Sequence, residues 1–169
     1  EELSGMPYQD ALSKEIWTKI GAESDASFIA PRYGIPISHG GFLANMRDMI
    51  RFGLLFTPSY KTVSEEKIIS DEHIDLILTK GNPKLMQNLY QNIPNANMPD
   101  DLRHNIYQWD AVYENGDFFK GGWAGQGLLI NSERDTVAVW TGYKRDEKHQ
   151  AREMRGIMRE LLDKTFEKE

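Results

Sequence analysis

The stretch FFKGGWAGQGLLINSERDTVAV, residues 118–139, decides the fold predicted for this chain. It opens with a glycine-dense segment, residues 120–127, which we expect to be a strand. An apolar run at 128–130, a polar turn at 131–135 and a second apolar run at 136–140 follow. Apolar runs bounded by turn residues are typical of adjacent antiparallel strands.

The unusual feature of this stretch is its glycine content, with Gly121, Gly122, Gly125 and Gly127 close together. A strand tolerates glycine poorly unless something must approach its backbone. Two interpretations follow, and both stay open at this point. The segment is either a bulged strand packed against a helix, or a strand whose amides face a substrate.

The neighbouring sequence adds a strand before this stretch and a helix after it. Residues 106–113 alternate as a strand, and Asn115-Gly116 is a strong hairpin signal that joins them to Phe118. Residues 149–166 carry apolar side chains on one helical face, as expected of a helix that covers a sheet. We therefore predict an α+β fold in which helices and long loops precede a three-stranded antiparallel sheet and a covering C-terminal helix. An uncovered edge of so small a sheet suggests a partner strand or a homodimer.

The first part of the chain is predicted to be helices and loops, in one structural unit that we divide into residues 1–105 and 106–169. Three helices are expected in it. The first spans residues 7–20 and is followed by Gly21 as C-cap. The second starts after Asn45 as N-cap, with Asp48 in the capping-box position, and the third spans 71–80 with Ser70 as N-cap. Two long loops are expected at 22–42 and 82–101, the second with one helical turn at 85–90. The first loop carries Arg32, Tyr33 and His39, which are weak candidates for lining a pocket.

Composition excludes several classes of function. The chain has 169 residues, a net charge of −6 and no cysteine, with a pI near 5.3. Nucleic acids and anionic membranes require a basic face, so neither is an expected partner. Disulfides and thiolate sites are excluded, and no apolar run is long enough to span a bilayer. Because the chain starts at Glu1, in what reads as a helix, we expect it to be a piece of a longer protein.

No common cofactor or metal motif occurs in the sequence. The four histidines, His39, His73, His104 and His149, stand far apart and without metal-ligand spacing. The sequence also lacks a G-x-S-x-G elbow, a Walker loop and a dinucleotide-binding fingerprint. We predict no metal and no cofactor.

Two short matches to penicillin-recognising serine enzymes have better explanations. Ser64 and Lys67 match Ser-x-x-Lys, but the two glutamates between them would keep Lys67 charged, so capping is the better account of Ser64. Tyr90 and Asn92 match Tyr-x-Asn, in what reads as an irregular loop. A third match, at Lys120-Gly121-Gly122, falls in the glycine-dense segment and is different.

The segment YQWDAVYENGDFFKGGWAGQGLLINSERDTVAVW, residues 107–140, resembles the closing part of serine hydrolases of the class C β-lactamase-like superfamily, especially the 6-aminohexanoate-dimer hydrolase type. Residues 4–28, SGMPYQDALSKEIWTKIGAESDASF, resemble the helix and loop after the family's tyrosine motif. Residues 40–56, GGFLANMRDMIRFGLLF, resemble its next helix. The resemblance covers nearly the whole chain and matches least at 82–101.

The resemblance implies roles for the glycine-dense segment. Lys120, Gly121 and Gly122 fall on the family's third motif, Lys-Thr-Gly or a variant, and the backbone N–H of Trp123 falls on an oxyanion-hole donor. We therefore expect Lys120, Gly122 and Trp123 to be catalytic, and Gly121, Gly125 and Gln126 to bind substrate. Gly121 in place of Thr and the bulky Trp123 depart from the β-lactam-recognising pattern, which favours an esterase, amidase or peptidase.

The family's serine nucleophile and tyrosine base would lie upstream of Glu1, so we expect this chain alone to be inactive. We call the longer protein that would contain this chain the parent. The parent is expected to attack a small-molecule or peptide-like ester or amide and to pass through an acyl-enzyme. The competing prediction is a non-catalytic ligand-binding or regulatory module of the same fold. A third possibility is an unrelated α+β domain without a helix across its strands. The resemblance to this family implies that the protein is periplasmic or secreted.

Overall fold

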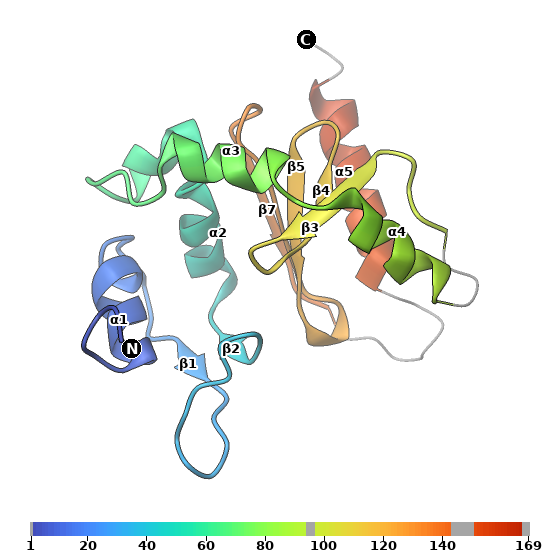
Figure 1. The fold of residues 1–169 in the computed structure, drawn as a ribbon. Coiled ribbons are helices and arrows are strands. Elements are labelled where there is room, and N and C mark those ends of the chain that lie inside the picture. Colours follow the sequence, from blue (N-terminus) through green and yellow to red (C-terminus); the bar gives the residue numbers. More distant parts are fainter. Residues whose placement is uncertain (1, 94–96, 143–150, 167–169) are drawn as a thin grey trace.

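The computed structural model describes residues 2–93, 97–142 and 151–166, and its fold is α+β as predicted (Figure 1). The α-helices are α1 (Tyr8–Leu12), α2 (Met46–Leu54), α3 (Asp71–Thr79), α4 (Pro83–Gln91) and α5 (Ala151–Phe166). Three shorter helical turns are η1 (Ser13–Trp17), η2 (Pro58–Thr62) and η3 (Trp123–Gly125). The strands are β1 (Ser27–Phe28), β2 (Phe42–Leu43), β3 (Leu102–Ile106), β4 (Trp109–Tyr113), β5 (Asp117–Gly121), β6 (Gly127–Asn131) and β7 (Thr136–Trp140).

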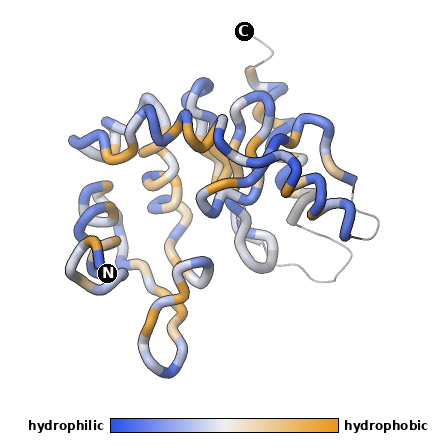
Figure 2. The backbone as a smooth tube through the Cα atoms, viewed as in Figure 1, coloured by the Kyte–Doolittle hydropathy of each residue, from blue (hydrophilic) through white to orange (hydrophobic). Residues whose placement is uncertain are grey.

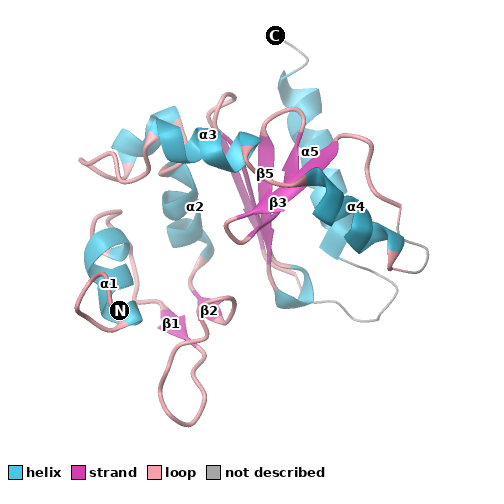
Figure 3. Ribbon diagram, viewed as in Figure 1, coloured by secondary structure: helices cyan, strands magenta, loops and turns pink. Residues whose placement is uncertain are grey.

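The main sheet is an antiparallel meander in which each strand pairs with the next, in the order β3-β4-β5-β6-β7 (Figure 3). It has five strands where three were expected. Residues 106–113 are not one strand, because the chain reverses at Tyr107 and Gln108, both with positive φ (48° and 69°). Ile106 then pairs with Trp109 across this turn.

The glycine-dense segment is likewise a hairpin and not the continuous strand that was predicted. β5 ends at Gly121, the turn η3 follows, and β6 begins at Gly127, directly opposite Gly121. Gly125 stands in this connection with φ of +103°, a conformation that favours glycine. The chain therefore folds back on itself within the predicted strand.

Helices cover both faces of the sheet, and apolar residues, orange in Figure 2, form a core on each face. On one face, Trp17, Leu55 and Ile77 from the first part of the chain pack against sheet residues that include Phe118 and Ile130. On the other face, α4 and α5 contribute the side chains that cover the sheet: Met86, Tyr90, Met158 and Leu162. Because both faces are covered, every residue of β6 is buried.

The predicted helix starts at Asn45 and Ser70 are confirmed. The Asn45 side chain accepts a hydrogen bond from the Asp48 N–H (2.8 Å), and the Ser70 hydroxyl accepts one from the His73 N–H (3.2 Å). Asp48 is fully buried, and its carboxylate accepts from the Glu23 N–H (2.8 Å). That contact ties the preceding loop to the start of α2.

Three segments differ from the prediction in detail. The expected helix at 7–20 is a short α1 followed by the π-helical η1. The loop at 22–42 contains a small hairpin, since β1 pairs with β2. The loop at 82–101 contains the nine-residue helix α4, which Asn82 caps and whose Met86 and Tyr90 are buried. These two side chains lie four residues apart on one helical face, so burial favours a helix despite the asparagine-rich composition.

The helix α5 is fastened to the start of β5. The buried Asp117 carboxylate accepts from Arg159 Nε (2.9 Å), from Asn131 Nδ2 (2.8 Å) and from Asn115 Nδ2 (3.0 Å). The Arg159 guanidinium lies 3.6 Å from the centre of the Tyr113 ring, and burial raises the pKa of the Tyr113 hydroxyl. A helix thus lies across the sheet, contrary to the expectation for an unrelated domain.

Candidate functional site

The residues of the predicted third motif lie at the end of β5, where the chain turns toward β6. On the β6 side, main-chain pairing continues to the end of the strand. Gly121 stands opposite Gly127, and the Gly122 N–H donates to the Gln126 carbonyl (2.9 Å). This edge of the segment is therefore occupied.

On the β4 side, a carboxylate takes over from the main chain. The register between β4 and β5 pairs Ala111 with Phe119, and beyond that pair the Asp110 side chain binds β5 instead. Asp110 Oδ2 accepts from the Gly121 N–H (2.7 Å), and Oδ1 accepts from Lys120 Nζ (2.7 Å). The Lys120 and Asp110 side chains are 37% and 44% exposed, so the ion pair lies at the surface.

The backbone N–H of Trp123 faces the same side as that of Gly121. Gly122 is extended (φ −114°, ψ 167°), and the amides of successive extended residues point to opposite edges of a strand. Since the Gly122 N–H points to β6, the Trp123 N–H points away from it. The hydrogen bonds of the described residues include none donated by this amide, and residue Trp123 is 93% exposed.

Local packing explains the glycine beside this amide. A Cβ atom on Gly122 would lie 2.8 Å from the Cβ of Gln126, whose side chain lies over that position. The predicted substrate-binding residues Gly125 and Gln126 are thus parts of the hairpin turn, and their predicted role toward a substrate stays a prediction.

The structure does not bring the other candidate residues to this site. Lys67 Nζ is paired with Asp71 (2.5 Å), and the Ser64 hydroxyl donates to the Glu66 carbonyl (3.0 Å) within its own turn. Tyr90 was expected in an irregular loop, but it is a buried residue of the helix α4. The weak pocket candidates lie exposed on the connection between β1 and β2: Arg32, Tyr33 and His39.

Two of the histidines contact other residues of the chain. His104 is buried, with Nε2 3.1 Å from the Leu78 carbonyl oxygen, and the His73 ring packs against Tyr107. His149 lies outside the described residues. In the described ranges, no group of three or more His, Cys, Asp or Glu residues is arranged to hold a metal ion. The helices in the same ranges include none with the length and apolarity of a membrane span.

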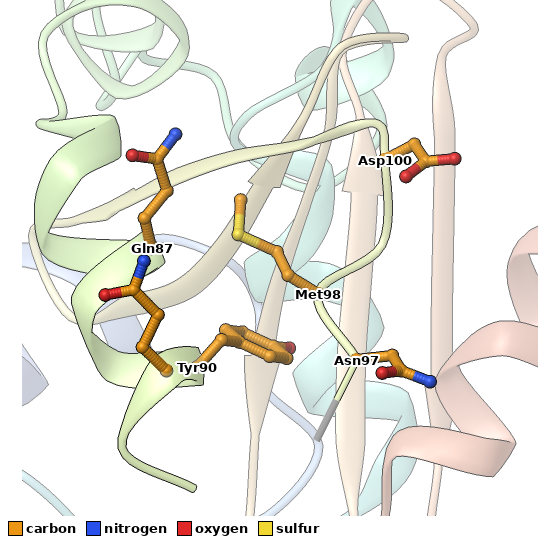
Figure 4. Close-up of a pocket in the computed structure, with 6 residues that line it drawn as sticks. Gln87, Tyr90, Asn97, Met98 and Asp100 are labelled. Carbon is orange, nitrogen blue, oxygen red and sulfur yellow. The ribbon is translucent and has the colours of Figure 1, made fainter. Parts of the chain in front are cut away.

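A groove of about 470 Å³ lies elsewhere, between α4 and the segment that leads into β3 (Figure 4). Three of its six lining residues have amide side chains, and one has a carboxylate: Gln87, Tyr90, Gln91, Asn97, Met98 and Asp100. It contains none of residues 120–123, and its lining offers no serine, lysine or histidine for acyl transfer. We therefore place the candidate site at the end of β5.

Asp110 is the residue that the sequence prediction missed. A signal for it was present, because a hairpin through Asn115-Gly116 that pairs Ala111 with Phe119 also sets Asp110 opposite Lys120. Opposite charges at such positions commonly interact across two strands. The additional contact with the Gly121 amide could not be read from the sequence.

No protein-family model matches the sequence. The chain is 24% identical over 139 residues to the 6-aminohexanoate-dimer hydrolase of Paenarthrobacter ureafaciens, in an alignment that covers 82% of this chain and 34% of that protein. It therefore spans about a third of the length of this curated relative. This similarity, together with the α+β architecture, is consistent with part of a β-lactamase-like hydrolase fold.

Proposed function

We propose that this chain is part of a β-lactamase-like serine hydrolase that cleaves an ester or amide bond through an acyl-enzyme. The chain supplies one wall of the reaction site, the end of β5. The observation that carries the proposal is the Trp123 N–H, which points to the edge of β5 away from β6 and has no acceptor among the described residues. The likeness to the 6-aminohexanoate-dimer hydrolase supports it independently.

In this proposal, a serine from outside these residues attacks the substrate carbonyl carbon and forms a tetrahedral intermediate, while a base, also from outside these residues, takes the hydroxyl proton and later gives it to the leaving group. The Trp123 N–H donates to the negative oxygen, together with the amide of the serine. The intermediate collapses, the alcohol or amine leaves with a proton, and water then hydrolyses the acyl-enzyme. A fixed donor of this kind contributes about 3 to 4 kcal/mol to lowering the barrier.

The serines of this chain whose hydroxyl partners are described have structural uses. Ser59 and Ser132 donate to the Asp135 carboxylate and the Phe56 carbonyl, and Ser70 caps α3. None of these hydroxyls is paired with a lysine or histidine that could remove its proton. This agrees with a nucleophile supplied from elsewhere.

The test removes the amide and keeps the rest of the turn. In the longest natural polypeptide that contains these residues, Trp123→Pro deletes the N–H, and Trp123→Ala deletes only the side chain. Proline suits this position, because Trp123 opens a helical turn and Gly122 is already extended. With p-nitrophenyl esters, we expect Trp123→Pro to lower kcat by roughly 100- to 1,000-fold relative to Trp123→Ala. Equal activity of the two variants would contradict the assigned role.

The competing proposal is a ligand-binding or regulatory module of the same fold. Labelling with a fluorescent phosphonate separates the two, since only an activated serine reacts. If the intact parent contains Ser-x-x-Lys but neither labels nor hydrolyses esters, the module is the better account.

A partner strand for β7 belongs to the same proposal. Among the described residues, β7 pairs only with β6, so its outer edge is available for a strand of the parent or of a second copy. Analytical ultracentrifugation tests the homodimer, and a monomer at high concentration would exclude it.

A further inference from the structure

Asp110 and Lys120 form a charge pair at the strand end that carries the proposed oxyanion donor. We propose that Asp110 determines the charge of the substrate that this site accepts. By neutralising Lys120, it adapts the site to esters or amides that are uncharged or cationic near the scissile bond, and it disfavours those with a carboxylate there. This inference rests on the proposed function.

The first step of the argument is the fixed position of the carboxylate. Asp110 uses one oxygen for the Lys120 ammonium and the other for the Gly121 N–H, both at 2.7 Å. Charge-assisted hydrogen bonds of this length are the strong ones. A Cβ atom on Gly121 would lie only 3.1 Å from Asp110 Oδ2, so the side chain is packed closely against the strand.

The second step is the position of the pair relative to the Trp123 amide. The N–H groups of Gly121 and Trp123 lie on the same edge, two residues apart, which corresponds to roughly 7 Å along an extended strand. The Asp110 carboxylate binds the first of these amides, and a substrate carbonyl would bind the second. At that separation, a unit charge still acts on a bound group, because the Debye length is about 8 Å at physiological salt.

The third step is the charge itself. A lysine alone at this edge would attract a substrate carboxylate, and an aspartate alone would repel both a carboxylate and the developing oxyanion. Together they leave little net field at the Trp123 amide. A glycine at 121 also provides no hydroxyl group with which to hold a carboxylate.

The decisive variant is Asp110→Asn. The asparagine oxygen can still accept from the Gly121 N–H, but the negative charge is gone and Lys120 becomes available to an anion. We expect anion affinity at the strand end to rise roughly fivefold to tenfold at low salt, from the Coulomb energy of one unpaired charge at this distance. Asp25→Asn is the matched control, since Asp25 is exposed and lies outside the sheet, and the variant changes the net charge equally.

The first measurement is made by NMR on the protein and needs no activity. Benzoate and benzamide, which have the same shape, are titrated while the backbone amide signals of residues 121–123 are followed. In Asp110→Asn we expect tighter benzoate binding, unchanged benzamide binding and loss of the effect in 0.5 M salt. The dispersed amide spectrum reports whether the variant is folded, and Lys120→Gln in the Asp110→Asn background should abolish the gain. Benzoate binding that is unchanged, or that rises equally in Asp25→Asn, would overturn the proposal.

The second measurement is made on the intact parent enzyme. The ratio of kcat/KM for a carboxylated ester, mono-p-nitrophenyl succinate, to that for the neutral p-nitrophenyl butyrate should rise roughly fivefold to tenfold in Asp110→Asn. A purely structural role would lower both rates together and leave the ratio unchanged, which contradicts the proposal. If the wild-type parent hydrolyses neither ester and does not label with a fluorescent phosphonate, the proposed function fails, and the NMR result still decides whether Asp110 sets the charge of this edge.

Discussion

Replacement of Arg159 by methionine tests how β5 is held in place. Arg159 Nε donates to Asp117, the first residue of β5, and Nη2 donates to Asp101 (2.5 Å). The side chain of Asp117 is only 1% exposed. Arg159→Met keeps an apolar stem of similar length on α5 but leaves this carboxylate buried without its cation.

The expected loss of stability is about 4 to 5 kcal/mol. Removing one partner of a buried ion pair typically costs about 3 to 5 kcal/mol, and the lower part of that range applies because Asn115 and Asn131 still donate to Asp117. Loss of the stacking on Tyr113 adds about 1 kcal/mol. The contact with Asp101, which is 38% exposed, adds less than about 1 kcal/mol.

Urea unfolding measured by circular dichroism gives the test. A loss of this size should lower the midpoint by about 1.5 to 2.5 M. Arg134→Met is the matched control, because Arg134 also binds α5, through Asp163, but both side chains are about a third exposed (30% and 37%), and its loss should cost less than about 1 kcal/mol. Adding Asp117→Asn to Arg159→Met should recover part of the stability. Equal midpoints for the two methionine variants, or no recovery, would refute the reasoning.

Two further predictions concern the packing of glycines in the fold and the turn between β6 and β7. Gly127→Ala should destabilise the fold by about 1 to 3 kcal/mol, because the added Cβ would lie 2.1 Å from the Trp140 ring. Gly156→Ala in α5 is the contrast, since a Cβ added there would have no neighbouring atom within 4 Å. In the same urea assay, it should stabilise the fold by about 0.5 to 1 kcal/mol. The Ser59 hydroxyl, which donates to Asp135 (2.6 Å), lowers the pKa of that carboxyl group. A carboxyl group whose pKa is lower in the folded state than in the unfolded state stabilises the fold at pH values above its unfolded-state pKa. This contribution to stability is lost as the pH falls through the folded-state pKa. The stability difference between wild type and Asp135→Asn should therefore shrink as the pH is lowered from about 6 to 3. A difference that is constant with pH would contradict this account.

Local signals in the sequence predicted the helix starts and one hairpin correctly. Asn45 and Ser70 cap α2 and α3 as expected, because an N-cap depends on residues within one turn. The Asn115-Gly116 turn joins β4 and β5, with Gly116 at φ of +84°. In each case, the residue type alone determines the local geometry.

The features that the sequence could not predict depend on residues that are distant along the chain. The turn at Tyr107 and Gln108 contains no Gly, Pro or Asn, and two side chains with positive φ give no signal of their own. The helix α4 is stabilised by burying Met86 and Tyr90 against the sheet. At the candidate site, the sequence predicted one continuous strand over 120–127, whereas β5 ends at Gly121 and β6 begins at Gly127. The contact between Asp110 and the Gly121 amide appears only with the register.

The glycine content of the hairpin, which first suggested a substrate, has explanations within the hairpin. Gly122 lies under Gln126, and Gly127 lies under the Trp140 ring. What sets this hairpin apart is its edge toward β4. Continuing the β4–β5 ladder past Phe119 would add backbone hydrogen bonds, each worth about 0.5 to 1.5 kcal/mol. Instead, the pairing of β4 with β5 stops at Ala111 and Phe119, and the Asp110 carboxylate binds the Gly121 N–H at the end of β5. Local rules are broken most often at functional sites, so the unextended ladder is a stronger reason than the glycines to place a site beside the Trp123 amide.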